Sequence, residues 1–510
     1  MLLNTVLHSP GLDPLALAGA FVVLSTLYFV WTSSQKPPFP LINGKKPFEI
    51  KYTNARKRFL RDARNLINTG FSQASVFRLV SDDGTKIVLD AKYANDIRSH
   101  HGLSFGAAVA REFHSTLPGF EPFKQGTTSD EIFQDAVRMK LTQSLGNVTE
   151  PLTAETSVAL EKHWTNNRVD WHDIALKPSI LQLVAQLSSK VFLGDKICRN
   201  PDWLRITISY TVDSFVAAQD LRLWPALVRP VVAKFLPSCR KVRREIQETR
   251  DIISPVIKER REAKEAANRA GKKPERYHDA MEWMEECAKG RPYDPAIAQL
   301  SFSLAAIHTT SDMITQVLLD ICQCEGLIQE MRKEIISVIQ EEGWKKTALY
   351  KLKLMDSVVK ESQRLKPIGI GSMRRLAQED IELSDKTIIP KGSVCFVSSN
   401  KSWDPNVYQD PNTFDPYRFL RLRETPGNET WAQLVSPSPE NLGFGFGKHA
   451  CPGRFFAANE VKIALCHMLL KYDIRLAEGC KPTTRTNGLS LVADPFARIS
   501  IKRREDEIAL

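Results

Sequence analysis

Apolar and polar positions alternate with two different periods along the chain. Two short segments near the start, residues 75–80 and 86–89, have strand-like patterns and flank the turn residues Asp-Asp-Gly, so they predict a β-hairpin. After this hairpin a helical repeat dominates, whereas residues 367–453 are dense in Pro and Gly and predict short strands and loops. The pattern predicts helices over residues 240–269, 295–324, 352–365 and 455–471. This order of elements indicates a mainly α protein with small β-sheets.

The N-terminus carries a different hydrophobic pattern. No charged residue lies between Asp13 and Lys36, and residues 15–31 are almost wholly apolar. About 20 helical residues, at ~1.5 Å each, span the ~30 Å of a bilayer core. A cleaved signal peptide is the alternative, but the segment lacks a basic start. We therefore predict a lumenal N-terminus, a transmembrane anchor, a Pro-rich basic linker and one large domain, over residues 1–14, 15–35, 36–50 and 51–510.

Basic residues follow the apolar segment rather than precede it. The first Lys is residue 36, and a dense series of Lys and Arg then extends to residue 64. By the positive-inside rule the domain is cytosolic, as in a single-pass protein of the endoplasmic reticulum membrane. The glycosylation sequons at Asn147 and Asn428 should then carry no glycan.

The amino-acid composition excludes fewer functions than the pattern of apolar and polar residues does. The 510 residues are 43% hydrophobic and 25% charged, which suits a globular protein with a large core. Its formal net charge of +11 indicates an anionic partner, and nucleic acid, membrane and acidic protein all remain open at this point. The nine cysteines are scattered, which is typical of a reducing compartment and not of a disulfide scaffold.

One cysteine has a distinctive context. Glycines cluster before Cys451, and a helical pattern begins just after it. Glycine permits close approach to a flat ligand, and a helix start favours the thiolate that a soft metal or haem iron requires. A buried structural cysteine, a zinc ligand and a phosphate loop are the alternatives. The glycine spacing fits no phosphate loop, and zinc would need further ligands nearby.

Two other segments carry charged or polar residues at helical spacing. Glu361 and Arg364 lie three residues apart on one predicted helix face, and Arg418 follows in a Pro-rich loop. For Glu361 and Arg364, an exposed ion pair is the alternative. Residues 305–312, Ala-Ala-Ile-His-Thr-Thr-Ser-Asp, place a polar group inside the long apolar helix. Such breaks often mark function, although a solvent-facing stripe is the alternative.

Together these motifs resemble the cytochrome P-450 superfamily. Phe444, Gly447, Cys451 and Gly453 match the spacing of its haem-binding loop, and the resemblance covers residues 37–505. It implies the P-450 fold, with Cys451 as axial thiolate ligand of haem b and Phe444 and Gly453 beside the haem. It also implies that Glu361, Arg364 and Arg418 form a buried structural network.

The resemblance assigns the polar helix segment to oxygen activation. Thr309 takes the position of the family's threonine, which helps to deliver protons to bound dioxygen. Two positions depart from the family pattern: Ala306 replaces a glycine and His308 replaces an acid. His308 is either a substitute proton carrier or a structural histidine, and Asp312, one turn further, is its candidate partner.

The resemblance also implies cationic partners for the haem propionates. Arg375 and His449 take two such positions, although His449 stands where Arg is commoner. Arg138 matches the arginine of the family's early helix, but Gln134 replaces the usual tryptophan four residues before it. Lys140 is the second choice for that contact.

The resemblance implies a monooxygenase that uses O2 and electrons from NADPH. The electrons arrive through a flavoprotein reductase that docks near Lys448, so the net charge no longer indicates nucleic acid. Residues 278–283 (His-Asp-Ala-Met-Glu-Trp) and 446–451 (Phe-Gly-Lys-His-Ala-Cys) resemble those of fungal enzymes that oxidise diterpenoids and indole diterpenes in secondary metabolism. This resemblance implies a bulky polycyclic terpenoid as substrate. The alternatives are a haem-thiolate isomerase or dehydratase and a non-catalytic membrane haem protein. The apolar residues expected to line the pocket are Phe105, Phe113, Phe120, Phe123, Tyr210, Phe215, Leu223 and Trp224.

Overall fold

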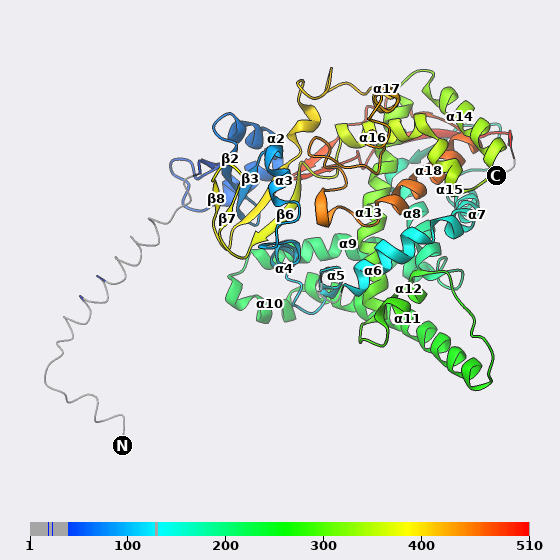
Figure 1. Cartoon of the computed structure of the whole chain (residues 1–510), viewed down its shortest axis with the longest axis horizontal. Coiled ribbons are helices and arrows are strands. Elements are labelled where there is room, and N and C mark those ends of the chain that lie inside the picture. The colour runs from blue at the N-terminus through cyan, green and yellow to red at the C-terminus, as the bar shows by residue number, and fades with distance from the viewer. Residues whose placement is uncertain (1–18, 20–22, 24–38, 128–130, 509–510) are drawn as a thin grey trace. The chain divides into compact units, whose positions relative to one another are not determined.

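The computed structural model describes residues 19, 23, 39–127 and 131–508 (Figure 1). The chain divides into two compact units, residues 1–40 and residues 41–510. The anchor expected at residues 15–35 lies outside the described residues, apart from Gly19 and Val23. Within the described part, no helix combines the length and apolar character that a membrane crossing needs.

The second unit begins with a mixed sheet of six strands in the order β1-β2-β3-β9-β6-β4. Strands β2 and β3 form the predicted hairpin, and β1 pairs with β2, so the unit begins at Leu41 rather than at residue 51. Strands β6 and β9 come from the Pro- and Gly-rich region and lie beside the N-terminal strands (Figure 1). The bounds are β1 (Leu41–Ile42), β2 (Val76–Ser81), β3 (Gly84–Leu89), β4 (Leu103–Ser104), β6 (Gly371–Ala377) and β9 (Val394–Ser398).

Helix α13 (Pro295–Cys322) lies at the centre of the helical part, where α8, α9, α11, α16 and α18 pack against it. Asp294 starts it, because its carboxylate accepts the backbone N–H groups of Ala296 and Ile297. The other helices are α2 (Thr53–Phe71), α3 (Ala94–Ile97), α4 (Phe105–Phe113), α5 (Glu121–Gln125), α6 (Ile132–Asp135), α7 (Leu145–His163), α8 (Leu176–Leu193), α9 (Pro201–Arg222), α10 (Arg229–Phe235), α11 (Pro237–Arg269), α12 (Ala280–Ala288), α14 (Leu327–Glu342), α15 (Lys346–Lys351), α16 (Lys353–Leu365), α17 (Arg418–Glu424) and α18 (Arg454–Lys471).

The remaining elements are short. A π-helical turn, η2 (Ala136–Leu141), follows α6, and single 3₁₀ turns include η3 (Ala226–Val228) and η5 (Gly447–His449). A three-stranded sheet has the order β10-β13-β5, and two pairs of strands complete the β structure. These strands are β5 (His172–Ala175), β10 (Tyr472–Leu476), β13 (Arg498–Arg503), β7 (Ile381–Glu382), β8 (Ile388–Ile389), β11 (Arg485–Asn487) and β12 (Ser490–Val492).

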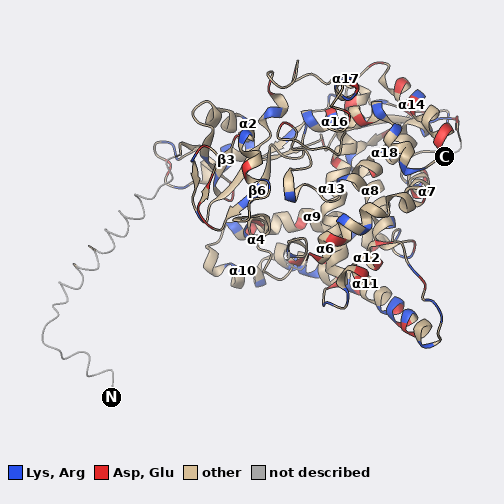
Figure 2. Cartoon of the chain, in the orientation of Figure 1, with Lys and Arg blue, Asp and Glu red and all other residues tan. Residues whose placement is uncertain are grey.

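The charge-rich helix predicted over residues 240–269 is α11, and Figure 2 shows Lys, Arg, Asp and Glu interleaved along it. One face of α11 is not simply solvated, because it forms ion pairs with residues at α12. Arg260 binds Asp279 at 2.6 Å, and Lys264 binds Glu282 at 2.7 Å. The pairs hold the long helix to the body of the unit.

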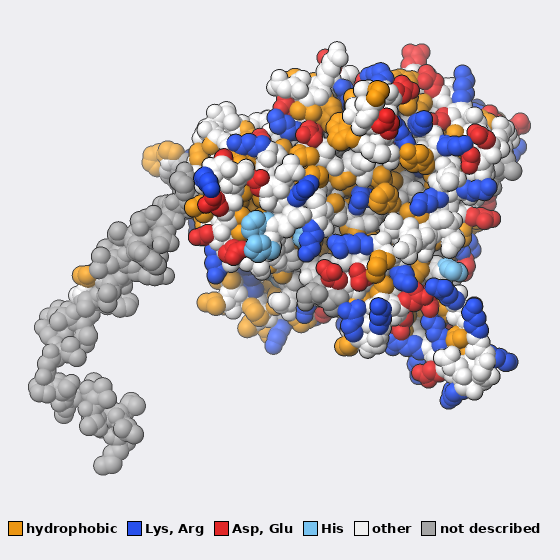
Figure 3. Space-filling model, viewed as in Figure 1, with side chains coloured by type: hydrophobic (Ala, Val, Ile, Leu, Met, Phe, Trp, Pro, Cys, Tyr) orange, Lys and Arg blue, Asp and Glu red, His pale blue; other side chains and the backbone are white. Residues whose placement is uncertain are grey.

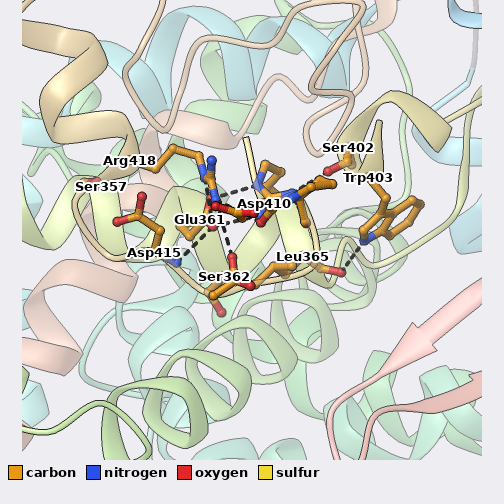
Figure 4. Close-up of polar contacts among 12 residues, drawn as sticks. Ser357, Glu361, Ser362, Leu365, Ser402, Trp403, Asp410, Asp415 and Arg418 are labelled. Atoms are coloured by element: carbon orange, nitrogen blue, oxygen red, sulfur yellow. Dashed lines mark hydrogen bonds and ion pairs between the residues drawn. The ribbon is translucent and has the colours of Figure 1, made fainter. Parts of the chain in front are cut away.

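The predicted network around Glu361 is confirmed as a fully buried one (Figure 4). The Glu361 carboxylate accepts both the Nε and Nη2 groups of Arg364, each at 2.8 Å, and the Nε group of Arg418 at 3.1 Å. Arg364 also donates to the carbonyl oxygens of Ser402 and Pro411. Two guanidinium groups thus share one carboxylate and tie α16 to the loop that precedes the cysteine segment, and their remaining donors meet backbone carbonyl oxygens.

Candidate haem site

A cavity of about 440 Å³ lies between α13, strand β6 and the loop that carries Cys451. All nine cysteines belong to the described residues, and Cys451 is the one that lines this cavity. Thr309, Ala305 and Ala306 face it from α13, and Phe444 and Gly453 face it from the cysteine loop. The structure therefore brings the two principal predicted motifs, 142 residues apart in sequence, to one space.

Tight backbone turns hold the cysteine loop. The Cys451 N–H donates to the Phe444 carbonyl at 2.7 Å, and the Lys448 N–H donates to the Arg98 carbonyl at 3.0 Å. Gly447 has a φ of +76°, and a Cβ atom there would lie 2.4 Å from the Arg98 Cβ atom and 2.6 Å from its carbonyl oxygen. Glycine is required at this position both for backbone conformation and for space.

The Cys451 thiol is buried, and burial raises its pKa. The backbone N–H groups of Gly453 and Arg454 and the charge of Arg454 oppose this shift. The donors at the helix start and the Arg454 charge therefore act on the sulfur, but the cost of burying a thiolate outweighs them. A buried sulfur that faces a cavity and receives backbone donors fits a bound iron, which would supply further positive charge.

Arg375 is a buried cation without an acid partner. Its Nη1 group donates to the Arg374 carbonyl at 2.8 Å, while the buried Nη2 group has no partner among the described residues. Burial lowers the pKa of Arg375 to about 10. The guanidinium lies 5.8 Å from the centre of the Phe105 ring. An unpaired buried guanidinium fits a propionate of haem.

Further cations gather around the same loop. Arg138 donates to the Lys448 carbonyl at 3.3 Å, whereas Lys140 pairs with Glu286 of α12 at 2.7 Å and is turned away from the loop. Desolvation and the charges of Arg375, Lys448 and Arg138 lower the pKa of His449 to about 4. His449 is therefore neutral near pH 7 and offers a hydrogen bond rather than a charge.

The polar segment of α13 separates into two faces. The Thr309 Oγ1 atom donates back to the Ala305 carbonyl, at 2.8 Å, and faces the cavity. His308 is turned away from the cavity, and its Nε2 atom lies 2.8 Å from the Ile208 carbonyl of α9. Burial lowers the pKa of His308, so a neutral ring with a proton on Nε2 fits this contact. The geometry matches a structural histidine better than a proton carrier.

Asp312 does not bind His308, and that expectation was wrong. Its carboxylate accepts the Lys177 ammonium at 2.8 Å, the Lys366 ammonium and the Ala493 N–H at 2.9 Å. Burial would raise the pKa of Asp312, but the two lysine charges outweigh it and lower the pKa. Asp312 joins α13 to α8 and to the segment after α16 because both nearby cations are closer partners than a neutral imidazole.

The predicted aromatic lining was also wrong. Phe113 stacks on Phe123 at 4.2 Å between ring centres, and Phe215 packs against both. These three rings therefore contact one another rather than the cavity. Phe105, Phe120 and Tyr210 likewise lie outside the cavity lining, and Leu223 and Trp224 are exposed. The apolar side chains that do line the cavity include Phe133, Phe192, Phe302 and Met313. Positions 302, 306, 309 and 313 follow the helical period, which is the signal that sequence reasoning missed.

Comparisons with known proteins agree with this site. A family model described as "Cytochrome P450" matches residues 133–499. Among solved structures, the retinoic acid-bound cyanobacterial CYP120A1 has a TM-score of 0.66 and 16% identity, covering 92% of this chain and 100% of that chain, and it shows the fold.

Curated relatives are much closer in sequence. Cytochrome P450 monooxygenase adrA of Penicillium rubens is 55% identical over 97% of both chains. Cytochrome P450 monooxygenase trt6 of Aspergillus terreus is 50% identical over 91% of this chain and 94% of the relative. A cytochrome P450 monooxygenase of Gibberella fujikuroi is 49% identical over 85% of this chain and 99% of its own. The chain therefore belongs to the cytochrome P450 family, as a monooxygenase whose cofactor is haem held by a cysteine thiolate.

Proposed function

We propose that the protein inserts oxygen into a C–H bond at an unactivated carbon of a bulky apolar substrate. The substrate is a polycyclic terpenoid, such as a diterpenoid or indole diterpene of fungal secondary metabolism. The observation that carries this proposal is that Cys451 and Thr309 line the same cavity, whose walls are otherwise mostly apolar. An apolar wall with few polar groups favours a large hydrophobic ligand.

The proposal gives each residue a role. Cys451 holds the haem, with Phe444 and Gly453 against it, and Arg375, Arg138 and His449 bind its propionates. When bound, haem supplies the activation of O2 for insertion into a C–H bond. The Thr309 hydroxyl stands in the cavity and transfers a proton, while α13 keeps it in place through its bond to Ala305. His308 fixes α13 to α9 and takes no part in proton transfer.

A spectrum of the reduced protein with carbon monoxide tests the cofactor assignment. We expect a thiolate-type Soret band from the wild-type protein and loss of haem from Cys451→Ala. Cys239→Ala is the matched control, because Cys239 is buried outside the cavity. A wild-type band that is not of the thiolate type would refute Cys451 as ligand.

Turnover tests the reaction. Polycyclic terpenoids should be oxidised only when NADPH, the reductase and O2 are all present. Product without O2 or reductase would instead favour an isomerase or dehydratase. Electron transfer would occur at a basic surface near exposed Lys448, so Lys448→Glu should slow reduction by the reductase and leave the spectrum unchanged.

The proposal places the enzyme on the endoplasmic reticulum membrane, with residues 15–35 as anchor and the domain in the cytosol. Support from the described residues comes from η3 and α10, where Leu227 is 93% exposed and Phe235 is 64% exposed. Hydrophobic side chains gather in this part of the surface (lower left in Figure 3). Lys234 directly precedes Phe235 in α10. Exposed apolar groups beside cations suit a bilayer surface.

A further inference from the structure

One basic side chain, Arg374 of β6, lines the cavity among otherwise uncharged described residues. Its Nη1 group forms an ion pair with Glu112 at the end of α4. In the described part of the chain its Nε and Nη2 groups have no partner, and Nε is fully buried. Glu112 does not line the cavity, so it neutralises the guanidinium from behind.

Arg374 and Arg375 are neighbours in β6, where the pairing with β9 shifts register between Ser372 and Arg375. Their surroundings differ. Arg375 is buried, lies 5.8 Å from the Phe105 ring at the start of α4, and is not among the described residues that line the cavity. Arg374 lines the cavity and pairs with Glu112 near the end of α4, which leaves its Nη2 group to meet a ligand there.

The net charge of the Arg374–Glu112 pair determines which oxygen-containing group of a ligand it can bind. Arginine offers donors and no acceptor, so it requires an acceptor oxygen on the ligand. Because Glu112 already neutralises Arg374, a free carboxylate in the cavity would add an uncompensated negative charge away from water. A neutral carbonyl oxygen adds none and still accepts a hydrogen bond from a charged donor.

We infer that the Arg374–Glu112 pair binds the carbonyl oxygen of a ketone or ester on an otherwise apolar substrate and disfavours the corresponding free acid. This inference rests on the proposed function and adds the chemical class of the substrate's polar group.

A matched set of tricyclic diterpenoids tests it: abietadiene, methyl abietate and abietic acid. Dissociation constants are measured by equilibrium dialysis and by the spin-state shift of the haem-loaded protein. We expect methyl abietate to bind the wild-type protein about tenfold more tightly than abietadiene, as expected for one hydrogen bond from a charged donor. Abietic acid should bind more weakly than its ester.

Three variants separate the causes. Arg374→Met and the double variant Arg374→Met/Glu112→Met should both lose the preference for the ester, and the double variant leaves no unpaired charge behind. Glu112→Gln exposes the positive charge of Arg374, so the acid should gain at least tenfold relative to the ester. Arg111→Met, which removes a guanidinium on α4 that contacts the Gly392 carbonyl outside the cavity, should change neither ratio.

The outcomes distinguish this inference from the function on which it rests. Equal binding of the three ligands by the wild-type protein, or an acid preference that Glu112→Gln does not increase, overturns the role of the pair and leaves the terpenoid pocket intact. Failure of all three ligands to bind refutes the terpenoid pocket and the role of the pair together.

Discussion

At the scale of single residues, Cys451 and Thr309 line one cavity, and Arg375 is buried without an acid partner among the described residues. All three lie in motifs of fixed spacing, which is why the sequence alone predicts them as site residues. The partner of Asp312 could not be predicted, because Lys177 and Lys366 lie 135 and 54 residues away and approach it only through tertiary packing. A one-turn spacing suggested His308, but a neutral ring competes poorly with two ammonium groups.

The Thr309 hydroxyl is expected to be needed for coupling rather than for folding. Thr309→Ala should bind haem normally but form at least about tenfold less product per NADPH consumed, because the cavity loses its proton-donating hydroxyl. Thr309→Ser keeps the hydroxyl and should restore most of the coupling. The amount of product formed and the amount of NADPH consumed are measured in the same reaction. Normal coupling in Thr309→Ala would remove the threonine from proton transfer.

His467 is expected to limit stability in acid. It is fully buried, stacks on Trp344 at 5.0 Å, and neither ring nitrogen has a partner in the described part of the chain. Burial and then Lys471 lower its pKa to about 3. The folded protein thus binds fewer protons than the unfolded chain below about pH 6.5, and stability falls as the pH falls toward 3.

His467→Phe should therefore stabilise the protein by about 1 kcal/mol at pH 8, because it removes unpaired buried nitrogens while retaining the stack. The gain should grow below pH 6.5 by up to ~1.4 kcal/mol per pH unit. Thermal unfolding across pH 4.5–8 measures both effects. The exposed His101→Phe variant serves as the control, and a gain independent of pH would contradict the titration argument.

At the scale of elements, the periodicity of apolar residues predicted the long helices but not which residues of other elements they contact. The predicted ends of the helices that became α13 and α16 agree with the structure to within two residues. Asp294 and Pro295 mark the start of α13, and Pro367 follows the end of α16. The cavity lining depends instead on which helix face turns inward. The sequence predicts that aromatic residues around positions 113–123 line the cavity, but they meet Phe215 of α9 and form a cluster of their own.

The cysteine loop is expected to depend on Gly447 for space as well as for backbone conformation. Gly447→Ala should destabilise the loop by more than about 1 kcal/mol and reduce haem retention, because its Cβ atom would collide with Arg98. Gly427→Ala is a matched control, with a φ of +88° but open space around it. Haem dissociation to apomyoglobin measures retention. Equal losses in the two variants would assign the effect to backbone strain alone.

The Glu361 network is expected to be far more important for stability than exposed ion pairs. Glu361→Gln leaves Arg364 and Arg418 buried without their counter-charge and should cost about 3–5 kcal/mol. Glu382→Gln, which breaks an exposed pair with Lys386, should leave the free energy of unfolding almost unchanged, because water screens that pair. Denaturant unfolding compares them. Similar small losses would mean that Arg364 is held by its carbonyl contacts instead.

At the scale of the whole molecule, residues 41–510 form one compact unit. The six-stranded sheet explains why: it combines strands from residues 41–104 with strands from residues 371–398, so no single cut of the chain separates independent cores. The charge of +11 could not be mapped onto a surface from the sequence alone. Many of the cations are paired, as along α11 and α12.

Membrane association is expected to persist without the N-terminal segment. A protein lacking residues 1–38 should still bind phospholipid vesicles through the apolar surface of η3 and α10. Adding Leu227→Ser and Val231→Ser should weaken that binding at least tenfold, because each removes exposed apolar area from the bilayer. Vesicle sedimentation measures it. Complete release by truncation alone would assign all membrane affinity to residues 1–38.

The adjacent arginines of β6 have a consequence for how such enzymes diversify. Because Arg374 lines the cavity whereas Arg375 is buried and does not, substitution at position 374 should alter substrate choice with little effect on cofactor retention. A single-residue deletion before the strand should have the opposite effect, since a shift of one position would move Arg375 out of its buried place. Natural variants with new substrates should therefore arise by point substitution at position 374, and length changes should be excluded between Pro367 and Arg375.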